Sequence, residues 1–362
     1  MNTFNAYFKR HFLTSWVKPV VFTILGLISI LTQYIEANNN YVDSGAILPH
    51  TLFDSITVIV CIVAVITPIL EFATFNNKRN LDTIFSLPIS KTKVLMAHYV
   101  TGITHIVITI TVLYITWLIA WVYAPFTLMN ESYVFIFYPL VLLASICVYT
   151  VYSFVFLQAN TIIDGCIFMY LHTFVPLIIL YWISSNNIDI IPYHNNLLLK
   201  NMSLSGSHFA LPIILNRLFN YVSIPDYISY VPIEVTFRDF QIYRYEIALI
   251  WLFVILTIIS FILMIICFNK KSPANAGNIS NSWFGYKTLG PIHSILGGLS
   301  VKAFLESLFS GFAPLLSLIL ILVPIITFLG YMIYRRGVKF KIPDIIVMAL
   351  TVLLAIFNVK IY

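Results

Sequence analysis

Long apolar runs separated by short polar segments dominate the chain. A helix needs roughly 17 to 25 apolar residues to cross the hydrocarbon core of a bilayer. Runs of about this length or longer lie at 18–35, 55–75, 95–123, 133–157, 161–183, 246–268, 312–334 and 344–361. The first six are well defined and the last two less so. The pattern predicts an all-α protein that crosses a membrane several times, because helices satisfy their own backbone hydrogen bonds in lipid.

The composition excludes an ordinary soluble domain. Hydrophobic residues make up 60% of the 362 residues and charged residues only 9%, whereas charged residues are about 25% of a typical soluble domain. The four cysteines lie singly inside apolar runs, without the spacing of zinc ligands, so we expect neither a disulfide framework nor a metal site. These cysteines are Cys61, Cys147, Cys166 and Cys267.

Basic residues set the expected orientation. The net charge is +6, but the basic residues flank apolar runs, which follows the positive-inside rule and argues against nucleic acid as a partner. The loops 36–54 and 124–132 hold none. With a cytoplasmic N-terminus, the inner segments up to residue 311 hold eleven: Lys9, Arg10, Lys18, Lys78, Arg79, Lys91, Lys93, Lys270, Lys271, Lys287 and Lys302. We therefore expect a multi-pass protein of a bacterial cytoplasmic membrane.

The first segment, 2–17, predicts an amphipathic helix. Its large apolar residues recur at three- and four-residue spacing, and Lys9 and Arg10 fall on another face. The apolar residues are Phe4, Tyr7, Phe8, Phe12 and Trp16. Such a helix is expected to lie in the inner membrane interface.

The segment 80–93, between the second and third apolar runs, predicts a short helix bounded by breaks. Asn80 is the expected N-cap, and Pro88 is expected to stop the helix because it disfavours helical geometry at the preceding residue. Ser90 is expected to cap the next helix. One apolar face carries Leu81, Ile84 and Phe85.

Glu71 lies near the inner end of the second apolar run. A carboxylate at that depth is costly unless it is paired. Arg79 or Lys78 is the partner expected from the sequence.

The order of these residues resembles the signature of type-2 ABC transporter permeases. Glu71 is followed by the basic pair Lys78-Arg79, by Asp82, and by the segment Ser86-Leu87-Pro88-Ile89-Ser90-Lys91. The resemblance implies a six-span permease core over 1–271, with an elbow helix at 2–17, a coupling helix at 80–93 and an outer connection at 185–243. It also implies contacts with an ATPase subunit at Leu81, Ile84, Phe85, Leu87 and Pro88. Glu71 and Arg79 would, by the same resemblance, form the ion pair that organises the coupling region.

The same resemblance implies the partners and the cofactors. An ABC ATPase subunit would bind ATP and Mg²⁺, because this chain has no G-x-x-x-x-G-K-[ST] motif and would bind no cofactor itself. A second permease, identical or related, would complete the translocation path within the membrane lipid. The expected role is export of an amphiphilic, peptide, drug or lipid-like cargo, with no catalytic residue in this chain.

After residue 271 the chain departs from the minimal family pattern. Residues 272–299 form a Gly/Ser/Asn-rich stretch, expected to be a cytoplasmic linker. Residues 300–362 then predict a second interfacial helix followed by two further spans. This region is either an added two-span hairpin or the start of a degenerate second copy.

Polar residues inside the apolar runs are further candidates. Asp164 is a candidate for a polar residue on the translocation path, or for an acid at a helix N-terminus. His98 and His105 are seven residues apart on one helix face, and we expect them to make interhelical hydrogen bonds.

Two other classes of function compete with a permease. A secondary transporter or channel would have inverted repeats, interrupted spans and carboxylates at the membrane centre. A membrane-embedded enzyme would need a catalytic constellation, and the chain contains neither H-E-x-x-H nor G-x-S-x-G.

Overall fold

The computed structural model describes residues 3–44, 51–123, 131–185, 237–280 and 342–357, together with scattered positions between 282 and 332. Every element in this part of the chain is helical. The elements are α1 (Thr3–Ser15), α2 (Val17–Ser44), α3 (Thr51–Phe72), η1 (Ala73–Asn76), α4 (Lys78–Phe85), α5 (Lys91–Tyr123), α6 (Glu131–Leu157), α7 (Ile162–Ser185), α10 (Phe237–Asn269), η4 (Pro273–Asn275) and α13 (Ile342–Phe357).

Five stretches of the described helices are long and apolar enough to cross a membrane. They are Val17–Glu36, Thr57–Asn76, Lys91–Ala120, Phe137–Leu157 and Ile250–Asn269. These stretches confirm five of the six well-defined runs in the sequence, and the protein is a multi-pass helical membrane protein.

The remaining predicted spans have different outcomes. α7 covers the run at 161–183, although its described apolar part, Ile162–Phe174, is shorter than a span. α13 has 16 residues, fewer than the approximately 20 that a span needs. The run at 312–334 except for three positions, the outer connection apart from its two ends, and the expected helix after residue 300 lie outside the described residues.

The chain divides into two compact units. The first comprises residues 1–157 and 208–276, and the second comprises residues 158–207 and 277–362. α7, which the sequence groups with the other spans, belongs to the second unit. The candidate site described below lies within the first unit.

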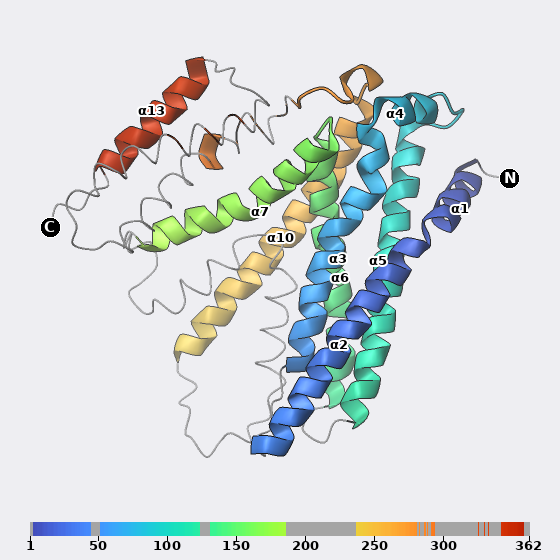
Figure 1. Ribbon diagram of the computed structural model, residues 1–362, viewed down its shortest axis with the longest axis vertical. Helices are drawn as coiled ribbons and strands as arrows, with labels where there is room; N and C mark the ends of the chain where they lie inside the picture. Colours follow the sequence, from blue (N-terminus) through green and yellow to red (C-terminus); the bar gives the residue numbers. More distant parts are fainter. Residues whose placement is uncertain are drawn as a thin grey trace. The chain divides into compact units, whose positions relative to one another are not determined.

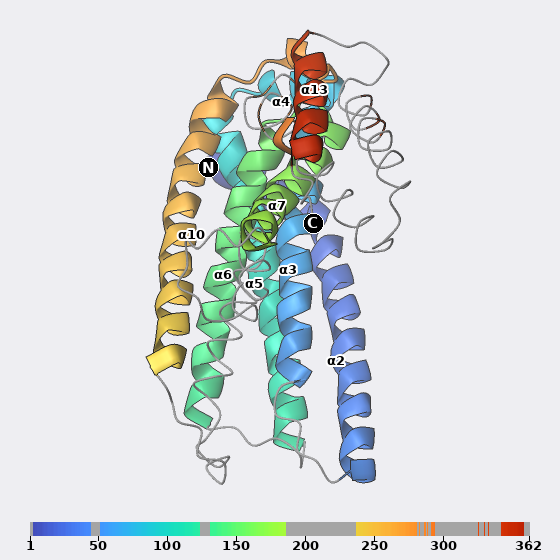
Figure 2. The same cartoon turned by 90° about the vertical axis from the view of Figure 1, so that its left-hand side faces the viewer.

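The first unit is a helical bundle. α3 packs against α2, α5 and α6, while α10 packs against α5 and α6, and both views show these helices side by side (Figures 1 and 2). Large aromatic side chains fill the interior, among them Phe72, Trp117, Tyr149 and Tyr152. Isoleucine, leucine and valine side chains stay exposed along α2 and α10, as expected for surfaces that lipid covers.

Two glycines allow close contact between helices. Gly26 on α2 lies against Leu113 of α5, and Gly102 on α5 lies against the hydroxyl end of Tyr149 on α6. A Cβ atom at either position would overlap these side chains. α5 therefore approaches α2 and α6 closely at these two positions, because neither glycine carries a side chain.

Candidate functional site

The side chain of Glu71, in the last turn of α3, is fully buried in the first unit. Its Oε1 atom accepts a hydrogen bond from Nζ of Lys18 at 2.7 Å, and its Oε2 atom lies 2.8 Å from Nε2 of His11. A buried carboxylate is tolerated only when charged or polar groups compensate for lost hydration. Glu71 therefore joins α1 and the start of α2 to α3.

The expected pairing of Glu71 with Arg79 is replaced by the pairing with Lys18 and His11. Arg79 and Lys78 are exposed on α4, whereas Lys18 also donates to the main-chain oxygen of Leu70 at 3.1 Å. The partners expected from the sequence, Lys78 and Arg79, follow Glu71 along the chain. The partners instead come from residues 53 and 60 positions earlier, brought close by helix packing.

α5 brings two buried histidines to the same carboxylate. Nδ1 of His98 lies 2.9 Å from the main-chain oxygen of Glu71. A carbonyl oxygen only accepts, so Nδ1 carries the proton, and in the neutral ring Nε2 accepts from the hydroxyl of Tyr7 at 3.1 Å. Nδ1 of His105 lies 3.2 Å from Oε1 of Glu71 without completing a hydrogen bond. The interhelical hydrogen bonds expected for His98 and His105 are confirmed, because Nε2 of His105 lies 3.4 Å from the hydroxyl of Ser15 on α1.

α1 presents a polar face to the bundle. Tyr7, His11 and Ser15 follow one another at four-residue spacing and approach His98, Glu71 and His105 respectively. The predicted helix at 2–17 is confirmed as Thr3–Ser15. The aromatic pattern of this helix does not reveal that His11 contacts Glu71. The spacing of Tyr7, His11 and Ser15, four residues apart on one face, could have indicated a polar contact with the bundle.

The rings of Phe4, Phe8 and Phe12 form a row on α1. Successive ring centroids are 6.3 Å and 6.2 Å apart. The Phe12 ring also stacks at 5.5 Å on that of His105. Burial raises the pKa of Tyr7, against the opposing charge of Arg10, so the phenol remains a hydrogen-bond donor at neutral pH.

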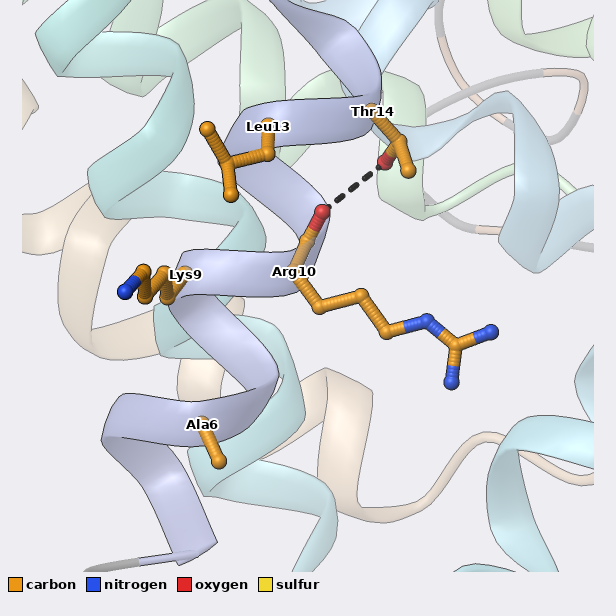
Figure 3. Close-up of a pocket in the computed structure, with 5 residues that line it drawn as sticks. All are labelled: Ala6, Lys9, Arg10, Leu13 and Thr14. Atoms are coloured by element: carbon orange, nitrogen blue, oxygen red, sulfur yellow. Dashed lines mark hydrogen bonds between the residues drawn. The ribbon is translucent and has the colours of Figure 1, made fainter.

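The outer side of α1 carries a shallow hollow. Ala6, Lys9, Arg10, Leu13 and Thr14 line it, and the hydroxyl of Thr14 donates to the main-chain oxygen of Arg10 at 3.1 Å (Figure 3). The two basic side chains extend from the helix at this hollow.

The short helix predicted between two spans is present as α4, but its boundaries differ. Oδ1 of Asn77 accepts from the backbone N–H groups of Arg79 and Asn80 at 3.0 and 3.4 Å. Asn77 is therefore the N-cap, and the expectation that Asn80 caps the helix is wrong. The helix ends at Phe85, three residues before Pro88, and Ser90 directly precedes α5 as predicted.

The residues expected to contact an ATPase have unequal exposure. Leu81 is 0% exposed, so in this conformation it is unavailable to a partner. The ring of Phe85 packs edge-on against Phe268 with centroids 6.0 Å apart, and Ile84 is partly buried. Leu87, at 37% exposure, and Pro88 remain accessible. The apolar face of α4 thus binds its own bundle.

A second polar cluster braces the ends of four elements near α4. Nζ of Lys271 donates to Oδ1 of Asn76 at 2.8 Å and to the main-chain oxygen of Leu157 at 3.3 Å. Nζ of Lys91 donates to the main-chain oxygen of Lys271 at 3.0 Å and lies 4.5 Å above the ring of Phe85. Burial lowers the pKa of Lys271 to about 7. These contacts connect η1, α5, α6 and α10 behind the short helix.

Asp164, the candidate for the translocation path, lies in the second unit and is buried. Its carboxylate accepts from the N–H and hydroxyl of Ser280 at 3.1 and 2.8 Å, and from the hydroxyl of Tyr286 at 2.7 Å. These bonds fasten the start of α7 to residues 280–286, which favours a structural role.

The fold and these clusters define an all-helical, multi-pass membrane protein with a short helix braced between two spans. No protein-family model, curated protein or solved structure matches the chain. Any narrower assignment therefore depends on the residues themselves.

Proposed function

We propose that the chain is the membrane-spanning permease subunit of an ATP-driven ABC exporter, energised by a separate ATPase subunit that docks at α4. The observation that carries this proposal is the way in which α4 is held. Asn77 alone separates it from η1, and residues 86–90 alone separate it from α5. A short helix connected to two spans by so few residues transmits displacement better than a flexible loop does.

The contacts behind α4 support this role. The buried side chain of Leu81 fixes the helix to the bundle, and the ring of Phe85 contacts the ring of Phe268 on α10. Lys91 and Lys271 link the starts and ends of neighbouring spans at the same place. A push on α4 would therefore reach α3, α5 and α10 together, which is how a rigid-body transition between two arrangements is driven.

The exposed surface of α4 defines where the ATPase would dock. Leu87 and Pro88 of the predicted contact set are exposed, and so are Asp82 and Thr83 beside them. ATP and Mg²⁺ would be bound by the partner, because this chain has no Walker motif. A second permease, identical or related, would complete a path for an amphiphilic, peptide, drug or lipid-like cargo in a bacterial cell membrane.

Site-specific cross-linking tests the proposal. A photo-reactive amino acid replaces Leu87, and in a control chain it replaces Val122, which is 69% exposed near the other end of α5, about 45 Å away along the helix axis. After irradiation in cells, cross-linked products are purified and identified by mass spectrometry.

We expect an ATPase with a Walker motif to be cross-linked at position 87 and not at position 122. Its absence at position 87, in chains that are inserted normally, would refute the assignment and favour a secondary transporter or a channel. Capture of the same ATPase at both positions would also contradict docking at α4.

A further inference from the structure

We propose that His11, Glu71 and His98 form a binding site for a divalent transition-metal ion, with Zn²⁺ as the ion that fits best. The three residues come from α1, α3 and α5, and each offers one ligand atom within 4.8 Å of the others. Two imidazoles and one carboxylate are a ligand set that zinc uses, with a fourth position left for water or another group. The inference does not depend on the proposed transport function.

The atoms that would bind the metal are already oriented by their neighbours. Nδ1 of His98 is held by the main-chain oxygen of Glu71 at 2.9 Å, which leaves Nε2, now bonded to the hydroxyl of Tyr7, as the ring nitrogen that could bind a metal. Oε1 of Glu71 is held by Lys18, which leaves Oε2 facing His11. Metal-binding histidines and carboxylates are typically fixed by outer hydrogen bonds of this kind.

Only small rearrangements would admit the ion. Nε2 of His11 and Oε2 of Glu71 are 2.8 Å apart, somewhat closer than two ligands of one zinc ion at about 2.0 to 2.2 Å each. His11 would move its ring proton to Nδ1, and the bond from Tyr7 to Nε2 of His98 would open. The Tyr7 hydroxyl is now 3.1 Å from that nitrogen, so once displaced it would remain close to the bound ion.

The surroundings make the site accessible, and they also supply an opposing charge. The side chain of His11 is 18% exposed, whereas that of Glu71 is fully buried, so an ion would approach from the His11 side. The ammonium group of Lys18 lies 2.7 Å from the carboxylate and repels a cation. A bound ion would fasten α1 to α3 and α5 more firmly than the present hydrogen bonds do.

Metal content of the purified full-length chain tests the proposal. The protein is prepared in mild detergent with a histidine-free affinity tag, stripped with a chelator, incubated with ZnCl₂ and freed of loose ions. We expect about one zinc ion per chain by elemental mass spectrometry, and a stable tetrahedral spectrum in visible light when CoCl₂ replaces zinc. His11→Ala should lose both signals.

His293→Ala is the matched control, because His293 lies in the second unit, outside the cluster. This variant should retain one zinc ion per chain. Thermal unfolding of the metal-free His11→Ala protein checks that it is folded. Absence of zinc from the unmodified chain, or full retention of zinc in folded His11→Ala, would overturn the proposal.

Lys18→Gln gives a second test, in which zinc affinity should rise, whereas His11→Ala should abolish binding. Glutamine keeps a hydrogen-bond donor for Oε1 of Glu71 and removes the positive charge. Zinc affinity should rise by about tenfold or more, because a unit charge about 5 Å from a divalent cation weakens binding by at least this much even in a water-like dielectric. Unchanged or weaker affinity would contradict binding at this cluster.

Discussion

The ion pair between Lys18 and Glu71 should be strongly asymmetric when its two members are removed separately. Glu71 is fully buried, whereas the side chain of Lys18 is 24% exposed. Loss of Lys18 would leave a buried carboxylate with only histidines around it. Loss of the Glu71 charge would leave an ammonium group that can extend toward water.

The structure gives approximate magnitudes for this asymmetry. Removing one member of a buried pair costs about 3 to 5 kcal/mol, and His11 retains part of the compensation, so Lys18→Met should lower the free energy of unfolding by about 3 kcal/mol. Glu71→Gln keeps an acceptor and loses one charged hydrogen bond, for a cost of about 1.5 kcal/mol. The double variant leaves no buried charge and should cost only about 2 kcal/mol, which gives a coupling energy of about 2.5 kcal/mol.

Denaturant titration in detergent micelles measures the four free energies. The slope of each transition is compared as well, because a changed slope would signal loss of two-state behaviour. Lys9→Met is the control: it removes an exposed lysine on α1 and should change stability by less than about 0.5 kcal/mol. Additive effects of the two substitutions within about 0.5 kcal/mol, or a larger loss for Glu71→Gln than for Lys18→Met, would refute the reasoning.

Three further predictions concern other contacts. Leu81→Ala should lower the free energy of unfolding by about 3 kcal/mol in the same titration, because it leaves a cavity beneath α4; a change below about 1 kcal/mol would contradict its burial. Gly102→Ala should lower the unfolding temperature, since the added methyl group overlaps the buried Tyr149, and Tyr149→Phe should relieve part of that loss. Because the pKa of Lys271 is lowered from 10.5 to about 7, the unfolded chain binds more protons between these values, so stability should rise with pH across that window. Lys271→Met should remove this rise, and the same pH dependence in both proteins would refute it.

The sequence was sufficient for five of the spans and for the existence of α4. Runs of apolar residues define membrane helices, because the bilayer core accepts only segments that are apolar and that satisfy their own backbone hydrogen bonds. The break before α5 was equally readable, since proline restricts the residue before it regardless of tertiary context. The N-cap was harder to assign, because Asn77 and Asn80 both have the right chemistry and only the course of the chain after η1 selects Asn77.

The buried cluster could not be assembled from sequence in the same way. Glu71 was recognisable as a carboxylate that needs a partner, but Lys18, His11 and His98 become its neighbours only through the packing of α1, α2 and α5 against α3. Local order along the chain favoured Arg79, which is close in sequence and exposed in the structure. Pairing of charges in a helical bundle is a tertiary property, and a sequence pattern limits it only weakly.

The sequence also does not determine what packs against the apolar face of α4. An amphipathic helix buries its apolar face against either its own protein or a partner, and the residue pattern is identical in both cases. Here Leu81 and Phe85 pack inward, so a docking partner is left with the turn at Leu87 and Pro88 and the polar side of the helix. If an ATPase docks here, substitutions at Leu81 should act through the stability of the permease, whereas substitutions at Leu87 should act through binding. For each variant, the unfolding temperature and the amount of ATPase recovered with the permease are measured. A Leu81 variant should lower the unfolding temperature, whereas a Leu87 variant should lower ATPase recovery alone.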